Sequence, residues 1–192
     1  MWRLALRAAP VPLLLRRDRG FANDEAHVGA ADVLRYASTA RQILKGPLVL
    51  EIEGPGDPLA SAENVLRALA LVHEHHPDIL TGLVIDGPLL NEYARELRDL
   101  GLNYLVLRMD AGSIESARRL VDHAVYRAEF LERDDAATLC VEEQRRALMV
   151  AQQFKLPVAA RITLLPTVND LEVETLATWA CEGGAERVDV VG

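Results

Sequence analysis

The sequence predicts an α/β protein in which six strands alternate with helices and pair in parallel. Short apolar runs recur along the chain, helical patterns separate them, and glycine or proline follows nearly every run. Parallel neighbours need long crossover connections, and strands covered by helices become apolar throughout. A curved, open (β/α)6 barrel and a doubly wound flat sheet both satisfy this pattern.

In the first half of the chain, three apolar runs are predicted strands and two stretches are predicted helices. The strands span residues 2–8, 48–52 and 79–85, and the helices span residues 31–44 and the segment from Ser61 through Val72. Gly46 and Pro47 end the first helix, and Ser61 has the side chain of an N-cap for the second.

The second half continues the alternation. The predicted strands span residues 104–109, 157–165 and 187–191, and the predicted helices span 90–100, 114–127, about 135–154 and 169–182. Asn169, with Glu172 three residues on, resembles a capping box. The sixth strand has no helix after it in this sequence, so we expect either a fragment or a protein partner that covers this last strand.

Composition limits the classes of protein. The 192 residues suit one domain, residues 1–192, and the net charge of −8 argues against a nucleic-acid partner. No apolar stretch approaches the roughly 20 residues of a membrane helix, so no membrane contact is expected. Two separated cysteines cannot build a disulfide framework, which favours the cytoplasm. Five arginines among residues 1–19 also fit a targeting segment, but residues 1–20 are better used as a first strand and loop.

Ligands of parallel α/β folds bind beyond the carboxyl ends of the strands, and a small set of polar or glycine residues lies there. The candidate site consists of Glu53, Gly54, Pro55, Gly56, Asp57, Asp86, Arg108, Asp110, Arg161, Thr163 and Asn169. His73, His75 and His76 lie at a helix end, where histidine is favoured without any metal, so we predict no metal site.

The segment from Glu53 to Pro58 is the most distinctive of these. Its glycines let the backbone approach a ligand closely, and its amides and carbonyls suit a small zwitterion such as an amino acid. The alternative is a tight turn that needs glycine for its dihedral angles. The segment lacks the Gly-Lys-Ser/Thr of a Walker A loop and the Gly-x-Gly-x-x-Gly of a dinucleotide site.

This segment, extended to Ala60, resembles the glycine-rich signature of the radical S-adenosylmethionine (SAM) maturases that build the nitrogenase iron–molybdenum cofactor precursor, the NifB-type family. Residues 83–89, 105–111 and 164–170 resemble three further motifs of that family, in the same order. The resemblance runs from about Phe21 to the C-terminus. It implies a partial (β/α)6 TIM-like barrel of radical SAM type, SAM as the small-molecule ligand, and a part in nitrogenase cofactor biosynthesis for nitrogen fixation.

The departures from the family are as informative. The family binds a [4Fe–4S] cluster through Cys-x-x-x-Cys-x-x-Cys after the first strand, whereas Ala9–Arg19 contains no cysteine. Because thiolates hold such clusters, none is expected here. Family asparagines are replaced by Asp86, Asp110 and Arg161, and a family glycine by Thr167.

The resemblance therefore implies a cluster-less, radical-SAM-like protein with a residual SAM-type site and an accessory or degenerate role in cofactor assembly. In it, residues 53–57 would meet the methionine amino group and Asp86 the ribose hydroxyls, a nitrogenase-assembly protein is one candidate partner, and enzymatic activity is left open. Two alternatives remain: a fragment of an active maturase, and an unrelated small α/β-barrel enzyme whose acid–base residues are Asp86, Asp110 and Arg161.

Overall fold

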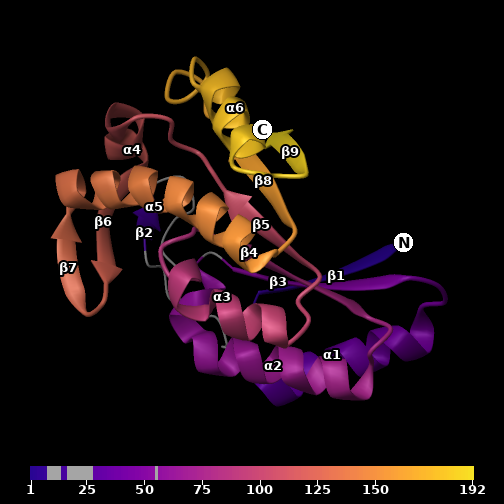
Figure 1. The fold of residues 1–192 in the computed structure, drawn as a ribbon. Coiled ribbons are helices and arrows are strands. Elements are labelled where there is room, and N and C mark those ends of the chain that lie inside the picture. Colours follow the sequence, from indigo (N-terminus) through magenta and orange to yellow (C-terminus); the bar gives the residue numbers. More distant parts are fainter. Residues whose placement is uncertain (8–13, 17–27, 55) are drawn as a thin grey trace.

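A curled sheet of six parallel strands forms the centre of the fold (Figure 1). The computed structural model describes residues 1–7, 14–16, 28–54 and 56–192. The strands follow the order β1-β3-β4-β5-β8-β9 and are β1 (Trp2–Arg7), β3 (Leu48–Glu53), β4 (Leu80–Ile85), β5 (Tyr104–Arg108), β8 (Val158–Thr163) and β9 (Arg187–Val191).

The strand order decides between the two predicted architectures. Each crossover moves one strand further in the same direction. Because such crossovers are right-handed, a constant direction places all the connecting helices on one face of the sheet. The sheet therefore curls into a partial barrel, and the doubly wound alternative, in which the direction reverses, is wrong.

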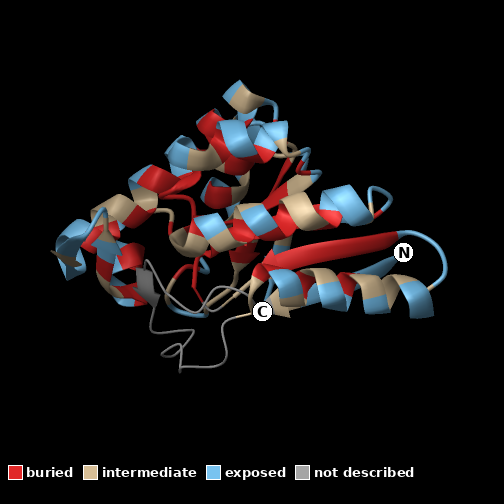
Figure 2. Cartoon of the chain, turned by 90° about the horizontal axis from the view of Figure 1, so that it is seen from below, coloured by how far each residue is buried: buried red, intermediate tan, exposed pale blue. Residues whose placement is uncertain are grey.

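The helices line the convex face of the sheet, and their outward sides are exposed (Figure 2). They are α1 (Ala30–Ile43), α2 (Ala62–His75), α3 (Leu90–Asp99), α4 (Ile114–Leu120), α5 (Arg133–Phe154) and α6 (Val173–Glu182), and a short 3-10 helix, η1 (Pro58–Ser61), precedes α2. No helix of the described part of the chain is both long and apolar enough to cross a membrane.

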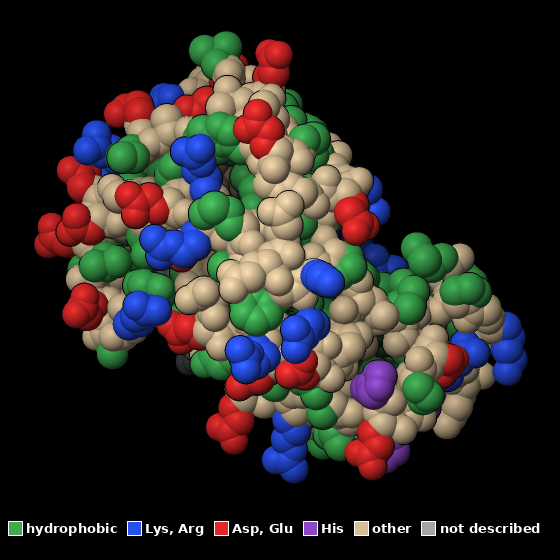
Figure 3. Space-filling model, in the orientation of Figure 1, with side chains coloured by type: hydrophobic (Ala, Val, Ile, Leu, Met, Phe, Trp, Pro, Cys, Tyr) green, Lys and Arg blue, Asp and Glu red, His purple; other side chains and the backbone are tan. Residues whose placement is uncertain are grey.

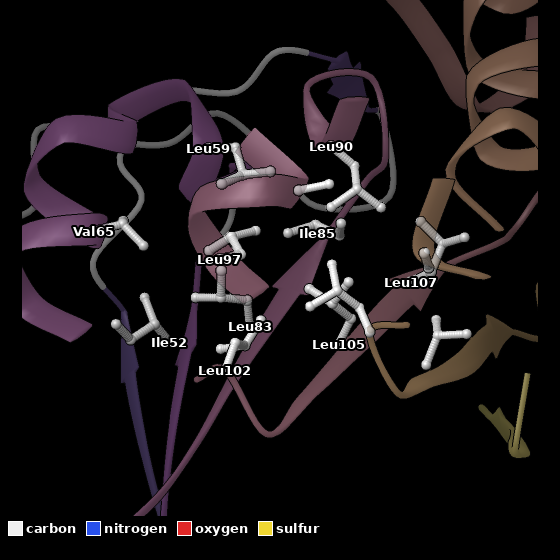
Figure 4. Packing of buried hydrophobic residues seen from close by; sticks show 14 of the residues in the cluster. Ile52, Leu59, Val65, Leu83, Ile85, Leu90, Leu97, Leu102, Leu105 and Leu107 are labelled. Atoms are coloured by element: carbon white, nitrogen blue, oxygen red, sulfur yellow. The ribbon is translucent and has the colours of Figure 1, made fainter. Parts of the chain in front are cut away.

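Alternate residues of each strand enter the core between sheet and helices, because successive side chains of a strand point to opposite faces. Ile52, Leu83 and Leu105 lie beside Leu97 of α3 in this core (Figure 4). The residues between them, such as Glu51, face the concave side, where a charged set of side chains gathers.

One predicted helix is wrong over half its length. Residues 114–127 form α4 followed by the strand β6 (Val121–Tyr126), which pairs antiparallel with β7 (Glu129–Glu132) and β2 (Leu14–Arg16). Arg127 and Ala128 both have positive φ, the backbone of a two-residue hairpin turn, although neither is a glycine. The sequence did not predict this hairpin, because its turn lacks the glycine or asparagine that usually occupies such positions.

One of the two predicted caps is wrong, and the other has the predicted position but no side-chain hydrogen bond. Helix α6 begins at Val173, and the side chain of Asn169 bonds to three loop groups instead of capping a helix. Ser61 does occupy the N-cap position of α2, but its side chain makes no capping hydrogen bond. The carboxylate of Asp57 caps η1 instead, by accepting from the amide of Leu59.

Candidate ligand-binding site

Asp57 ties two neighbouring loops together at the carboxyl edge of the sheet. Its Oδ1 accepts a hydrogen bond of 2.8 Å from the amide of Leu59, and its Oδ2 accepts one of 2.8 Å from the amide of Asp86. The side chain is completely buried. The loop after β3 is thereby fixed to the end of β4.

Arg108, the last residue of β5, donates hydrogen bonds to two carbonyls of the glycine-rich loop. Its Nη1 donates to the carbonyl of Gly54 at 3.0 Å, and its Nη2 donates to the carbonyl of Gly56 at 2.9 Å. Its Nε lies 2.9 Å from Oδ1 of Asp86, so the buried guanidinium also has a counter-charge. The planar fork of an arginine suits this task, because its donors diverge in fixed directions.

The charge of Asp86 is close enough to Asp57 to affect the protonation of Asp57. Burial, and then the charge of Asp86, raise the pKa of Asp57 to about 6, although two amide hydrogen bonds and the charge of Arg108 oppose the shift. The carboxyl group of Asp57, which holds the loop, therefore gains or loses its charge at about pH 6.

A second hydrogen-bond network, formed by Asp110 and Asn169, joins the ends of β5 and β8. The carboxylate of Asp110 accepts from the amide of Thr163, and Nδ2 of Asn169 donates to the carbonyls of Asp110 (2.9 Å) and Thr163 (2.8 Å). Oδ1 of Asn169 accepts from the amide of Leu165 at 2.8 Å. Asp110 and Asn169 are both completely buried, so they hold the loops in place.

Glu172 extends this second hydrogen-bond network to the start of α4. It accepts from the amide of Gly112 at 2.9 Å and from the hydroxyl of Ser113 at 2.5 Å. Partial burial opposes ionisation, but the hydrogen bonds, that of Ser113 first, lower the pKa of Glu172 overall. Ser113 also forms the capping box of α4 with Ser116.

Arg161 faces a different part of the sheet. Its guanidinium reaches across the concave face toward β3, where Nη1 lies 3.8 Å from Oε2 of Glu53 and Nη2 lies 4.0 Å from Oε1 of Glu51. Glu51 is buried and also bonds to Arg3 and to the hydroxyl of Tyr104. Burial, followed by the charge of Glu51, raises the pKa of Tyr104.

Sequence reasoning found most of the carboxyl-edge residues but, of the charged cluster on the concave face, missed Arg161's partners away from that edge. Arg3, Glu51 and Tyr104 were not predicted. One signal was available, because Glu51 is a carboxylate inside the apolar run 48–52, where a charge needs a partner. The partners themselves lie on other strands and cannot be paired from sequence.

The predicted residues fall into a buried group and an accessible group. The buried residues are Gly56, Asp57, Asp86, Arg108, Asp110 and Asn169, and the partly exposed ones are Glu53, Gly54, Arg161 and Thr163. Pro55 lies outside the described residues, as does most of the loop 9–19. Since Asp86 and Asp110 are buried in loop-holding networks, the arrangement does not favour the acid–base enzyme among the alternatives.

The cysteines of this chain do not fit a [4Fe–4S] cluster. Such a cluster takes three or four thiolates, and the chain has two cysteines. Cys140 is buried in α5 and Cys181 is exposed on α6. In the described part of the chain, no group of three or more His, Cys, Asp or Glu side chains is placed to hold a metal ion.

The surface carries charges of both signs. On the face drawn in Figure 3, Lys and Arg side chains are interspersed with Asp and Glu and form no broad basic area. This distribution accompanies the net charge of −8.

The sequence is similar to curated proteins named FeMo cofactor biosynthesis protein NifB, which confirms the resemblance. The protein of Chlorobaculum tepidum is 28% identical over 158 residues, which cover 82% of this chain and 37% of that protein. The protein of Methanocaldococcus jannaschii is 25% identical over 146 residues, which cover 76% of this chain and 48% of that protein. The chain thus spans less than half of these relatives. No protein-family model matches it.

Solved structures with the partial barrel of radical SAM enzymes have the same fold. The enzyme anSMEcpe with bound AdoMet superposes with a TM-score of 0.70 at 14% identity, covering 100% of this chain and 52% of that one. Methylornithine synthase (PylB) gives 0.66 at 16% identity, covering 99% and 52%. These likenesses confirm the predicted barrel.

Proposed function

We propose that this chain, a relative of NifB with the partial barrel of radical SAM enzymes, binds S-adenosylmethionine without cleaving it reductively. We place it in the cytoplasm as an accessory protein of nitrogenase cofactor assembly. The curated relatives are named for FeMo cofactor biosynthesis, and four of the solved structures with this fold contain S-adenosylmethionine.

The observation that supports a ligand site is the set of hydrogen bonds that holds Gly54, Gly56 and Asp57 in place. Arg108 holds the carbonyls of Gly54 and Gly56, and Asp57 anchors the following residues. A carbonyl oxygen has two lone pairs, so each of these carbonyls has the capacity to accept a second hydrogen bond. A pre-ordered loop binds a ligand without first losing conformational entropy.

The accessible residues of the loop suit a cationic group. The side chain of Glu53 is 27% exposed, and Gly54 beside it is partly exposed. We assign the ammonium group of the ligand's methionine part to Glu53 and the Gly54 carbonyl. Asp86 is buried against Arg108, so we give it the task of positioning that arginine and no contact with the ribose.

Reductive cleavage of the ligand needs an electron from an iron–sulfur cluster. The two cysteines of this chain lie on different helices and fall short of the ligand set, so we propose binding alone. A bound molecule that is not consumed suits an accessory role.

Calorimetric titration with S-adenosylmethionine tests the binding. We expect saturable binding that Glu53→Gln weakens about tenfold, which corresponds to about 1.4 kcal/mol. Glu115→Gln is the matched control, because Glu115 is an exposed carboxylate on α4, and it should leave binding unchanged. The proposal is refuted if the folded protein shows no saturable binding up to about 5 mM ligand, because a dissociation constant above that value is too weak for a cofactor site.

Anaerobic reconstitution with iron and sulfide tests the proposal that the bound S-adenosylmethionine is not cleaved reductively. We expect no stoichiometric iron and no 5′-deoxyadenosine after addition of dithionite and S-adenosylmethionine. A brown protein with about four irons per chain that releases 5′-deoxyadenosine would instead support an active maturase.

A further inference from the structure

A pocket of about 440 Å³ opens on the concave face of the sheet. Its rim includes Leu80, Pro157 and Glu186, which lie at the amino-terminal starts of β4, β8 and β9. Its volume is within the usual range of small-molecule sites. Neither Gly54 nor Thr163 lines it, but Arg161, which does, lies 3.8 Å from Glu53 at the start of the glycine-rich loop, so the pocket adjoins the site at the carboxyl edge.

At the floor of this pocket, the ring of Tyr104 packs closely against Gly82 of β4. Gly82 lies next to Tyr104 in register, and a Cβ at Gly82 would stand 2.2 Å from the tyrosine ring. The missing side chain lets the ring of Tyr104 lie across β4 and donate its hydroxyl to Oε2 of Glu51 at 3.0 Å. Arg3 neutralises the same carboxylate from the other side.

Arg161 supplies a cation whose donors are unused. Its side chain is only 20% exposed, yet within the described residues its guanidinium makes two ion pairs at 3.8 and 4.0 Å and no hydrogen bond. A guanidinium carries five N–H donors, and leaving them unsatisfied in a largely buried position is costly. A bound carboxylate would satisfy two of them in bidentate geometry.

Asp189 supplies the opposite charge next to it. It is the register partner of Arg161 on β9 and lines the same pocket. Both nitrogens of Arg187 that contact it approach Oδ2, at 3.0 Å each, so Oδ1 has no partner among the residues described. Arg161 reaches toward Glu51 and Glu53 on β3, and no ion pair between Arg161 and Asp189 forms among the described residues.

We propose that this pocket binds a zwitterionic aliphatic α-amino acid. The ligand's carboxylate bonds to Arg161, its ammonium group bonds to Oδ1 of Asp189, and its side chain lies against Val49, Leu80 and Pro157. A simple dianion is disfavoured, because Glu51, Glu53 and Asp189 would repel its second charge. This proposal does not depend on the function proposed above.

L-Leucine is the probe, with 4-methylpentanoate and 3-methylbutylamine as analogues that lack the ammonium and the carboxylate. Binding is followed by two-dimensional NMR of the arginine Nε–H groups and by calorimetry. We expect leucine to saturate and to shift the Arg161 signal, and each analogue to bind at least about tenfold more weakly, since each loses one charged hydrogen-bonding group.

Two variants place the ligand. Arg161→Gln and Asp189→Asn should each weaken leucine binding about tenfold or more. Arg98→Gln, which alters an exposed arginine on α3, should leave binding unchanged. Arg161→Lys keeps the charge but loses the fork, so it should restore only part of the affinity. Circular dichroism of each variant establishes that it is folded.

The proposal is overturned if folded wild-type protein shows no saturable leucine binding up to about 10 mM, a very weak affinity. Equal binding of leucine and 4-methylpentanoate would also overturn it. So would displacement of leucine by S-adenosylmethionine, because that result would place both molecules in one site.

Discussion

Nε of Arg108 lies 2.9 Å from Oδ1 of Asp86, and the two side chains are only 8% and 3% exposed. The two residues end neighbouring strands, β5 and β4, and their pairing holds the guanidinium where it reaches the carbonyls of the glycine-rich loop. This ion pair therefore supports the candidate site without facing the ligand.

Removing Arg108 should destabilise the protein strongly. Arg108→Met removes the Arg108 charge from beside the buried Asp86 carboxylate, for which we expect a loss of about 3–5 kcal/mol in the free energy of unfolding. Urea denaturation measures it. Arg98→Met is the control, because Arg98 pairs with Asp99 on the surface and should matter by less than about 1 kcal/mol. If the double variant Asp86→Asn/Arg108→Met is no more stable than Arg108→Met, the charge argument is wrong.

The raised pKa of Asp57 predicts a definite dependence of stability on pH. An acid whose pKa is higher in the folded state, about 6 here against an ordinary 3.8, holds its proton more tightly when folded. Stability due to this group is therefore greatest below about pH 4 and falls as the pH rises to about 6, by at most about 1.4 kcal/mol per pH unit. The difference in unfolding free energy between wild type and Asp57→Asn, measured from pH 4 to 7, should decrease and then level off. A difference that rises with pH would contradict this assignment.

Thr167 is strained, and glycine should relieve it. Its φ is 65°, a left-handed conformation that disfavours β-branched residues, and Arg119 fastens its carbonyl. Thr167→Gly should stabilise the protein by up to about 1 kcal/mol, because the strain removed exceeds the entropy that glycine adds to the unfolded chain. Thr178→Gly, in the middle of α6, should instead destabilise it by about 1 kcal/mol. Thermal melting of both variants checks the two opposite signs.

The close approach of Tyr104 to Gly82 predicts a large steric effect. The added methyl group of Gly82→Ala would stand 2.2 Å from the ring, so the ring must leave Glu51 or the strands must separate. We expect a loss of about 2–3 kcal/mol, typical of an overpacked core, in urea unfolding. Gly29→Ala, whose nearest neighbour is 3.9 Å away, should cost less than about 1 kcal/mol. If Gly82→Ala/Tyr104→Ala is not more stable than Gly82→Ala, the clash is not the cause.

Much of the fold was predictable because its signals are local. The six strands of the large sheet are apolar runs of five or six residues, and the observed bounds differ from the predicted ones by two residues at most. Gly101, with φ of 75°, ends α3 as its position predicted. The hairpin of β6 and β7 was missed because Arg127 and Ala128 hold a turn that glycine or asparagine usually makes.

The sequence by itself determined the alternation of strands and helices, the resemblance to NifB proteins and which polar residues lie at the carboxyl ends of the strands. Hydrophobic periodicity and motifs are written along the chain, so they can be read without coordinates. The tertiary structure confirmed the barrel that the resemblance implied, and it alone decided that Asp57, Asp86 and Arg108 hold the loop from within and that Arg161 and Asp189 line a second pocket. The reason is physical: burial and charge pairing depend on which strands become neighbours, and that choice is made by the packing of the whole chain.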